Sequence, residues 1–180
     1  PLQSGDDEIL KRMDRRYTRD DYINLINKIK TKIPQIAITS DVLVGFPGET
    51  DENFQNTVRL IKEISPLKIH IFPYSPREAT SAAANFKNEI NPLIIKERVS
   101  HLKNVSRACA VIYKKQFLNK DMDVLIEGYS KENPGFWEGH TDNYIRVLVK
   151  SPQNLKNQFI ALRLKKIIND FVLAVFVDYL

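Results

Sequence analysis

Residues 41–50 combine the side chains and turn residues in this sequence that are best suited to hold a ligand. They read Asp-Val-Leu-Val-Gly-Phe-Pro-Gly-Glu-Thr, so a β-branched stretch runs into a loop with two glycines, a proline and an acid. Glycine lets a ligand approach the backbone where a Cβ would block it. The loop has neither the Gly-Lys-Ser/Thr of a phosphate loop nor the Gly-x-Gly-x-x-Gly of a dinucleotide site, so it predicts neither function.

Two other loops are rich in turn residues and stand next to apolar stretches. They are residues 3–5, Gln-Ser-Gly, and residues 73–77, Pro-Tyr-Ser-Pro-Arg. The order of strand, loop, helix, strand and loop predicts βαβ units with parallel strands. In such folds the loops after the strand carboxyl ends form the active face. We therefore expect residues 3–5, 45–49 and 73–77 to meet on one face.

Helices and strands must place these loops. Thr18 and Thr50 are each followed by acidic residues and an apolar stripe, so each predicts a helix N-cap. Residues 36–44 and 67–72 are β-branched and apolar, which is typical of buried parallel strands. A long helix is predicted over residues 92–116, where apolar residues recur at helical spacing.

The composition limits the classes of function. The chain has 180 residues and one cysteine, Cys109, which excludes a disulfide scaffold and any cysteine-based zinc or iron–sulfur site of its own. Cys109 falls on the apolar stripe of the long helix, where a core residue is favoured over a reactive thiol. The net charge of +5 suits an RNA partner or an ordinary basic surface. The cysteine content fits a reducing compartment, so we expect a cytoplasmic protein. No apolar run is long enough to span a bilayer, so no membrane partner is expected.

After Phe117 the pattern changes to short strands separated by turn residues. Strand candidates are residues 122–127, 144–149, 159–164 and 171–177. About five short strands in some sixty residues predict a small closed or nearly closed β-barrel of the OB type. Aromatic and cationic side chains gather near these strands: Trp137, His140, Tyr144 and Arg146. Such pairs grip unpaired bases in small barrels, although Tyr144 can instead fill the interior and a lone histidine is more often structural.

Four motifs in one order resemble the methylthiotransferases, a radical S-adenosylmethionine family that sulfurates and methylates tRNA bases. The motifs are Pro-Leu-Gln-Ser-Gly at residues 1–5, Leu-Lys-Arg-Met with Arg15 and Tyr17, residues 45–50, and Phe-Pro-Tyr-Ser-Pro-Arg at residues 72–77. The tail over residues 139–147 resembles the TRAM domain of these enzymes. The resemblance implies an α/β fold: the carboxy-terminal part of a (β/α) radical SAM partial TIM barrel with its connecting helix over residues 1–116, then a small all-β, OB-like TRAM RNA-binding barrel over residues 117–180.

The resemblance also implies a substrate. Residues 3–5 point to the tRNA branch of the family, and His-Ile-Phe-Pro-Tyr-Ser at residues 70–75 resembles the branch that acts on threonylcarbamoyl-adenosine. The implied reaction adds a methylthio group to C2 of N6-threonylcarbamoyladenosine at position 37 of tRNA, with isopentenyladenosine as the alternative. The partners would be tRNA and S-adenosylmethionine, and no DNA is expected.

A set of S-adenosylmethionine contacts follows from the resemblance: Ser4, Arg15, Asp41, Val44, Gly45 and Tyr74. Ser4 would meet the ribose or methionine part, and its alternative role is a turn cap. Arg15 would hold the methionine carboxylate bidentately, and its alternative is a solvated charge at a helix end. Asp41 would lie along the cofactor or tie adjacent loops together. Glu49 would brace its own loop or the start of the following helix.

The RNA-binding residues are expected in the barrel: Trp137, His140 and Arg146. No residue of this chain is expected to be catalytic or to bind a metal. The family's chemistry needs a Cys-x-x-x-Cys-x-x-Cys loop whose [4Fe–4S] cluster cleaves S-adenosylmethionine to a radical, and a second cluster supplies sulfur. Neither cysteine triad occurs here, so both clusters would be bound by a missing amino-terminal part, and this chain alone is expected to be inactive.

Asp6 stands where the family commonly has serine after Gln-Ser-Gly. A stand-alone or truncated RNA-binding protein that kept the barrel and lost the catalytic half is the alternative function.

Overall fold

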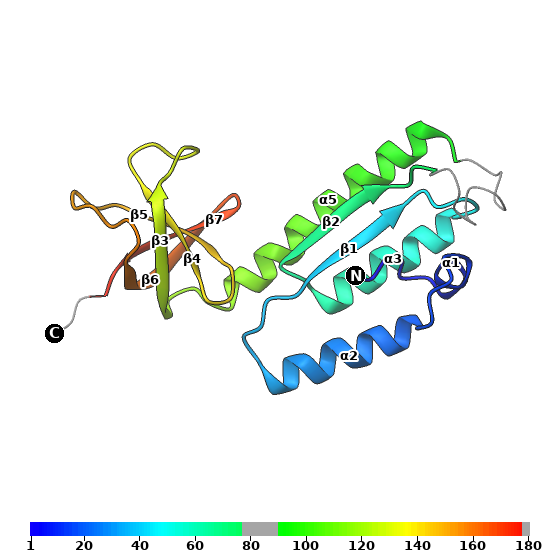
Figure 1. The fold of residues 1–180 in the computed structure, drawn as a ribbon, viewed down its shortest axis with the longest axis horizontal. Coiled ribbons are helices and arrows are strands. Elements are labelled where there is room, and N and C mark those ends of the chain that lie inside the picture. The colour runs from blue at the N-terminus through cyan, green and yellow to red at the C-terminus, as the bar shows by residue number, and fades with distance from the viewer. Residues whose placement is uncertain (77–89, 178–180) are drawn as a thin grey trace. The chain divides into compact units, whose positions relative to one another are not determined.

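The computed structural model of the protein describes residues 1–76 and 90–177. The chain divides into two compact units, Pro1–Ala110 and Val111–Leu180. In Figure 1 each unit can be followed by the colour scale, which runs from blue at the N-terminus to red at the C-terminus. The sequence places the boundary after residue 116, whereas this division falls within helix α5 (Pro92–Lys115). The end of α5 belongs with the second unit because the ring of Tyr113 packs at 5.1 Å from that of Phe117.

The first unit is built around parallel strands. Strand β1 (Thr39–Val44) pairs in parallel with β2 (Lys68–Pro73), and Val44 lies opposite Pro73. On the other side of β1, Gln3 forms an isolated parallel bridge with Val42. The parallel arrangement that the sequence predicts is therefore confirmed for β1 and β2.

Helices connect and cover these strands, and their bounds are α1 (Asp7–Arg12), α2 (Arg19–Lys32) and α3 (Asp51–Ile64), followed by α5. Thr18 caps α2 and Thr50 caps α3, each in a reciprocal capping box with the residue three positions later. Both predicted N-caps are thus confirmed. The C-cap of helix α3 is Ser65, which adopts a left-handed conformation with φ 43°.

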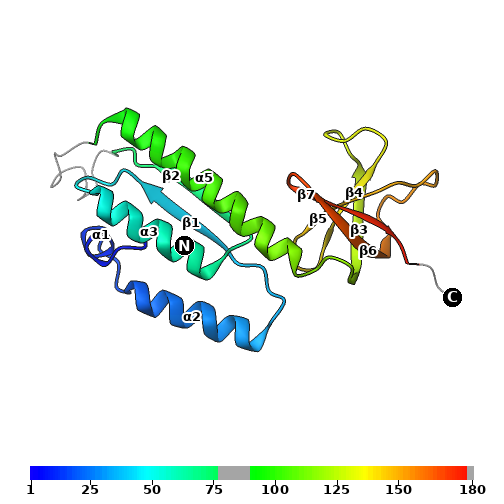
Figure 2. The same cartoon turned by 180° about the vertical axis from the view of Figure 1, so that it is seen from behind.

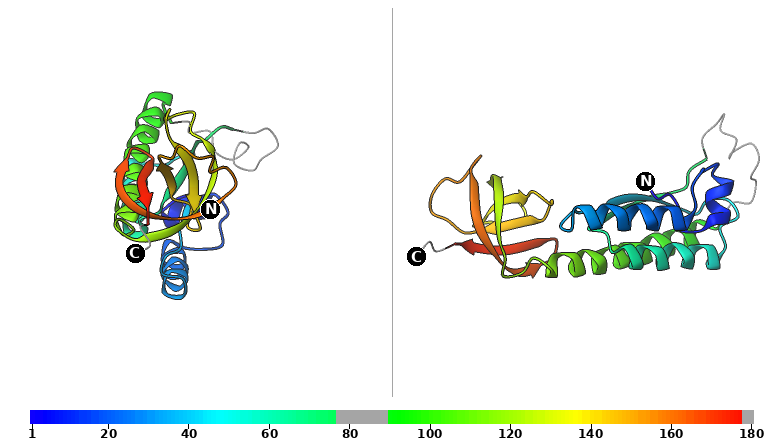
Figure 3. Two further views of the ribbon diagram at one scale, coloured as in Figure 1. Left: turned by 90° about the vertical axis from the view of Figure 1, so that its left-hand side faces the viewer. Right: turned by 90° about the horizontal axis from the view of Figure 1, so that it is seen from below.

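Helices α3 and α5 pack on one face of the strands, as Figures 2 and 3 show. The shared core contains buried residues from each element: Val42, Val44, Phe54, Val58, Ile61, Leu102, Val105 and Cys109. Cys109 is 2% exposed and its Sγ lies 3.7 Å from the carbonyl oxygen of Ile61. Burial raises the pKa of the Cys109 thiol, which favours the core interpretation of this residue.

The second unit contains a closed barrel with the strand order β3-β4-β5-β7-β6. The strands are β3 (Asp121–Tyr129), β4 (Trp137–Thr141), β5 (Arg146–Val149), β6 (Phe159–Ile168) and β7 (Phe171–Phe176). Neighbouring strands are antiparallel except β5 and β7, which are parallel. A small closed barrel in this part of the chain agrees with the strand pattern.

Two details of the barrel differ from the sequence pattern. Tyr144 lies in the turn before β5 with φ 62° and is 73% exposed, so its alternative role inside the barrel is wrong. Strand β4 (Trp137–Thr141) contains Gly139 and lies between the strand candidates 122–127 and 144–149, where the sequence pattern gives none. That glycine is needed in the strand because a Cβ there would collide with the carbonyl oxygen of Leu125. Among the described residues, no helix is long and apolar enough to cross a membrane.

Candidate functional site

The ends of β1 and β2 meet at one edge of the sheet. Because the strands are parallel, Gly45 and Tyr74 both leave at the carboxyl end, and the Tyr74 N–H donates to the carbonyl of Val44 at 2.7 Å. The ring of Phe46 meets that of Tyr74 edge-on at 5.3 Å. We call residues 45–49 together with Tyr74 the carboxyl rim. The expected meeting of these two loops is found, whereas Arg77 lies outside the described residues.

The loop of the carboxyl rim is held by its own acid. Gly45 and Gly48 both have φ 82°, a left-handed conformation that favours glycine. The Gly45 N–H donates to Oε2 of Glu49 at 2.7 Å. Glu49 therefore braces its own loop, which is one of the two roles expected from the sequence.

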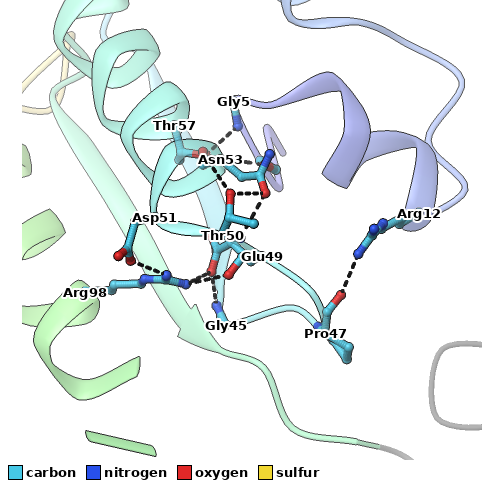
Figure 4. A network of polar contacts seen from close by, with 11 residues as sticks. Gly5, Arg12, Gly45, Pro47, Glu49, Thr50, Asp51, Asn53, Thr57 and Arg98 are labelled. Atoms are coloured by element: carbon cyan, nitrogen blue, oxygen red, sulfur yellow. Dashed lines mark hydrogen bonds and ion pairs between the residues drawn. The ribbon is translucent and has the colours of Figure 1, made fainter. Parts of the chain in front are cut away.

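Glu49 also receives a hydrogen bond from a residue that the sequence analysis did not single out. Nη1 of Arg98, on α5, donates to Oε2 of Glu49 at 2.9 Å, and Nη2 donates to Oδ1 of Asp51 at 2.6 Å (Figure 4). The side chains of Arg98 and Glu49 are only 7% and 3% exposed. Burial raises the pKa of Glu49, and the Gly45 N–H and the Arg98 charge oppose that rise.

A signal for Arg98 was present in the sequence. Ile95 and Leu102 belong to the apolar stripe of α5, and Arg98 follows Ile95 by three positions on the same helix face. An arginine within an apolar stripe predicts a buried ion pair, because its charge must be compensated there. The partner could not be found from the sequence, because Glu49 is 49 residues away.

A different arginine from the expected one reaches the rim. Nη1 of Arg12 donates to the carbonyl of Pro47 at 3.4 Å, and a Cβ on Gly48 would collide with it. Arg15 follows α1 and is exposed, and its positive charge opposes the rise in the pKa of Tyr17 that burial causes. Its assignment to the methionine carboxylate stays a prediction.

Ser4 is engaged within the protein. It is 1% exposed, its Oγ accepts from the Asp6 N–H at 3.2 Å, and it lies 3.3 Å from Oγ1 of Thr57 on α3. The Gly5 N–H donates to the same Thr57 oxygen at 2.9 Å. These contacts agree with the turn-cap role of Ser4, and its contact with a cofactor stays a prediction.

The remaining candidates point in different directions. Val44 is fully buried, so only its backbone faces the rim. Asp41 is half-buried on the opposite face of β1, where His70 is its register partner. No hydrogen bond or ion pair of the Asp41 carboxylate with another described residue is found, and both of its expected roles stay predictions. The hydroxyl of Tyr74 is buried and has no hydrogen-bond partner within the described chain.

The residues of the carboxyl rim can be compared with the needs of S-adenosylmethionine and of an iron–sulfur cluster. A buried phenol without a partner is costly unless a ligand or water bonds to it, so Tyr74 fits a polar group of S-adenosylmethionine at the rim. An iron–sulfur cluster does not fit this chain, since Cys109 is buried in the core and the described residues contain no group of three metal-ligating side chains. The described residues therefore give no basis for a reaction step at an iron–sulfur cluster.

In the barrel, the structure separates the expected RNA-binding residues. His140 lies opposite Arg146 on β5 and opposite Leu125 on β3, and Leu125 in turn lies opposite Phe159 on β6. We call Arg146, His140, Leu125 and Phe159 the cross-strand row. Trp137 lies on the other face of β4, and its Nε1 donates to the carbonyl of Ser151 at 3.3 Å.

The polar side chains of the cross-strand row have acidic partners within the barrel. Nδ1 of His140 lies 3.0 Å from Oε1 of Glu127, and Nη2 of Arg146 lies 3.1 Å from Oε1 of Glu132. The guanidinium of Arg146 stacks on the ring of Phe171 at 3.9 Å. The side chains of His140 and Arg146 therefore both have structural contacts, whereas Phe159 offers a ring that is 77% exposed.

Residues 1–61, the stretch that forms β1, the rim loop and most of α3, match the family model of the radical SAM superfamily. The chain is 42% identical over 164 residues to tRNA-2-methylthio-N(6)-dimethylallyladenosine synthase of Geobacillus kaustophilus, which covers 91% of this chain and 31% of the relative. A protein of the same name from Fusobacterium nucleatum is 39% identical over 166 residues, covering 92% of this chain and 38% of the relative.

A relative with another substrate in its name is also similar. Threonylcarbamoyladenosine tRNA methylthiotransferase MtaB of Bacillus subtilis is 37% identical over 168 residues, covering 92% of this chain and 37% of the relative. The chain thus spans about a third of the length of the curated relatives it matches. Its relatives are tRNA methylthiotransferases of two kinds.

Proposed function

We propose that this chain is part of a radical SAM tRNA methylthiotransferase, a transferase whose remaining part binds the clusters. The observation that carries the proposal is the carboxyl rim, where the parallel strands β1 and β2 end side by side. Strand β1 lies within the residues that match the radical SAM superfamily, and β2 follows them in the chain. Ligands of α/β folds bind outside the carboxyl ends of the strands. The names of the relatives supply the reaction class.

In this proposal the rim binds S-adenosylmethionine. Gly45, Val44 and Tyr74 would contact it along the strand ends, with the Tyr74 hydroxyl as a hydrogen-bonding group. Ser4, Arg15 and Asp41 complete the proposed set, Asp41 from the face of β1 opposite to the buried side chains of Val42 and Val44. A [4Fe–4S] cluster held by another part of the protein would supply the electron for the radical chemistry. This chain's own residues bind and orient the cofactor, and the chain alone is expected to be inactive.

The proposed substrate is an N6-modified adenosine at position 37 of tRNA. The dimethylallyl form is favoured by the names of relatives that are 42% and 39% identical to the chain. The threonylcarbamoyl form is the second candidate, because residues 70–75 resemble that branch and a relative of that name is 37% identical. In either case the product carries a methylthio group at C2.

The barrel is proposed to be an OB-like TRAM domain over residues 117–180 that binds tRNA in the cytoplasm, while residues 1–116 form the radical SAM part. Trp137, His140 and Arg146 are the proposed RNA contacts. The cross-strand row supports His140 and Arg146, since it places them on one surface with the exposed ring of Phe159. The bonded position of Trp137 favours a role in holding the barrel loops together.

Mass spectrometry of tRNA nucleosides tests the reaction. Cells from which the gene for this chain is deleted should lose one 2-methylthio adenosine derivative and accumulate its precursor. A plasmid copy of the gene should restore the product. Loss of the dimethylallyl product would support the first substrate, and loss of the threonylcarbamoyl product would support the second. An unchanged nucleoside profile would reject the proposed function.

A further inference from the structure

Helix α5 holds the loop of the carboxyl rim through one buried arginine. Besides its bond to the Glu49 carboxylate, Nη1 of Arg98 donates to the Glu49 carbonyl at 3.1 Å. The same Glu49 oxygen that receives Arg98 also receives the Gly45 N–H. A chain of hydrogen bonds therefore runs from α5 through Glu49 to the first residue after β1, as Figure 4 shows.

The contacts of Arg98 differ in how strongly water weakens them. Glu49 is buried, so its bond with Arg98 is screened little by solvent. The Asp51 side chain is 93% exposed, and its ion pair with Arg98 is correspondingly weak. The guanidinium also lies 5.3 Å from the centre of the Phe54 ring. Glu49 is therefore the main electrostatic partner of Arg98.

Packing alone does not account for an arginine at this position. Nε of Arg98 is buried without a hydrogen-bond partner among the described residues, which costs stability. Apolar residues of similar volume often replace buried ion pairs without loss of stability. What an apolar side chain could not do is hold the Glu49 carboxylate against the Gly45 N–H in a loop where Gly45 has φ 82°.

We infer that Arg98 is a positioning residue for S-adenosylmethionine binding: through Glu49 it fixes the backbone of Gly45 and with it the loop at the end of β1. This inference rests on the proposed function, in which that loop contacts the cofactor. Arg98 itself need not touch the ligand, because its guanidinium is engaged by Glu49 and Asp51.

Equilibrium binding of S-adenosylmethionine to the full-length protein tests the inference. Arg98→Met should weaken binding about tenfold, in the range found when a residue that couples to a site is removed. Arg98→Lys keeps the charge and should restore part of the affinity. Arg107→Met is the matched control, since Arg107 is an exposed arginine on the same helix. The melting temperature of each variant is measured in parallel, and binding is compared where every variant is folded.

A double-mutant cycle separates positioning from a structural role. If Arg98 acts through Glu49, then adding Arg98→Met to Glu49→Gln should change the affinity much less than tenfold. This pair also removes both buried charges, so it remains testable if Arg98→Met alone does not fold. An equal loss of affinity in both backgrounds, or a lower melting temperature with unchanged affinity, would overturn the inference. Failure of the unaltered protein to bind the cofactor would instead reject the proposed function.

Discussion

Two glycines of the rim loop share a backbone conformation but have different surroundings. Gly45 and Gly48 both have φ 82°. A Cβ on Gly45 would lie 2.7 Å from Cδ1 and Cγ1 of Ile95, which packs against the core. A Cβ on Gly48 would meet only the end of the Arg12 side chain, which is exposed and can move aside. The identity of Gly45 is therefore required by packing as well as by backbone conformation.

Alanine substitutions at these glycines should have unequal costs. Gly48→Ala should lower the free energy of unfolding by about 1 kcal/mol, the cost of the left-handed conformation. Gly45→Ala should cost about 3 kcal/mol, because an overpacked contact with Ile95 adds to that strain. Urea unfolding followed by circular dichroism measures both. Equal costs would show that Ile95 moves aside without penalty.

Asp6 is the N-cap of the short helix α1, and its side chain joins this helix to α3. Oδ1 of Asp6 accepts from the N–H groups of Glu8 and Ile9 at 3.0 and 3.2 Å, and Oδ2 accepts from Asn56 of α3 at 2.6 Å. Serine, which is common at this position in the family that this chain resembles, is also a strong N-cap. The departure at Asp6 is therefore compatible with the same local structure, and it adds the bond to α3.

Asp6→Ala should reduce the free energy of unfolding by about 1–2 kcal/mol at pH 7, and Asp6→Ser should cost less because it keeps an oxygen for the cap. Burial raises the pKa of Asp6, but the hydrogen bonds outweigh it, so the folded pKa lies below the usual 3.8. The stability that Asp6 contributes is therefore present above that value and is lost as the pH falls through the folded pKa. Urea unfolding at pH 7 and pH 3 measures this. A penalty for Asp6→Ala that grows at pH 3 would contradict the assignment.

A second prediction about the elements concerns tRNA binding by the strands of the barrel. Phe159→Ala should weaken tRNA binding about tenfold, since one stacked base is worth about 1–3 kcal/mol. Arg146→Ala should lower the salt dependence of binding by about one unit of the logarithmic slope. Phe176→Ala is the control, because Phe176 is also exposed but lies on β7, which is not part of the cross-strand row. Filter binding of tRNA at several salt concentrations measures these effects. Equal losses for Phe159→Ala and Phe176→Ala would remove the row from RNA binding.

Local patterns in the sequence predict elements better than they predict contacts between them. Thr18 and Thr50 predict where their helices begin, because the capping interactions involve only four consecutive residues. The rim follows from the parallel order of strands, which is a general property of βαβ units. Strand β4 is missed because the reason for Gly139 is the carbonyl of Leu125, which is on another strand. The partner of Arg98 is missed for the same reason, since Glu49 comes from a loop that is distant in the sequence.

At the scale of the whole molecule, each unit has a core of its own. Leu102 of α5 is fully buried in the core of the first unit, and Leu162 of β6 is fully buried in the barrel. Trp137, the one tryptophan in the sequence, lies on β4 and so reports on the barrel by its fluorescence. Because units with separate cores can unfold separately, a substitution in one core need not affect the other.

The same substitution at the two leucines should therefore act on different transitions in the 180-residue chain. Leu162→Ala should destabilise the barrel by about 3 kcal/mol and shift the Trp137 fluorescence transition to lower urea. Leu102→Ala should leave that transition in place and shift the helical signal at 222 nm, because the helices α2 and α3 and most of α5 belong to the first unit. If Leu102→Ala moved the Trp137 transition as far as Leu162→Ala does, the two units would unfold as one, and RNA binding by the barrel could not be studied apart from the rim.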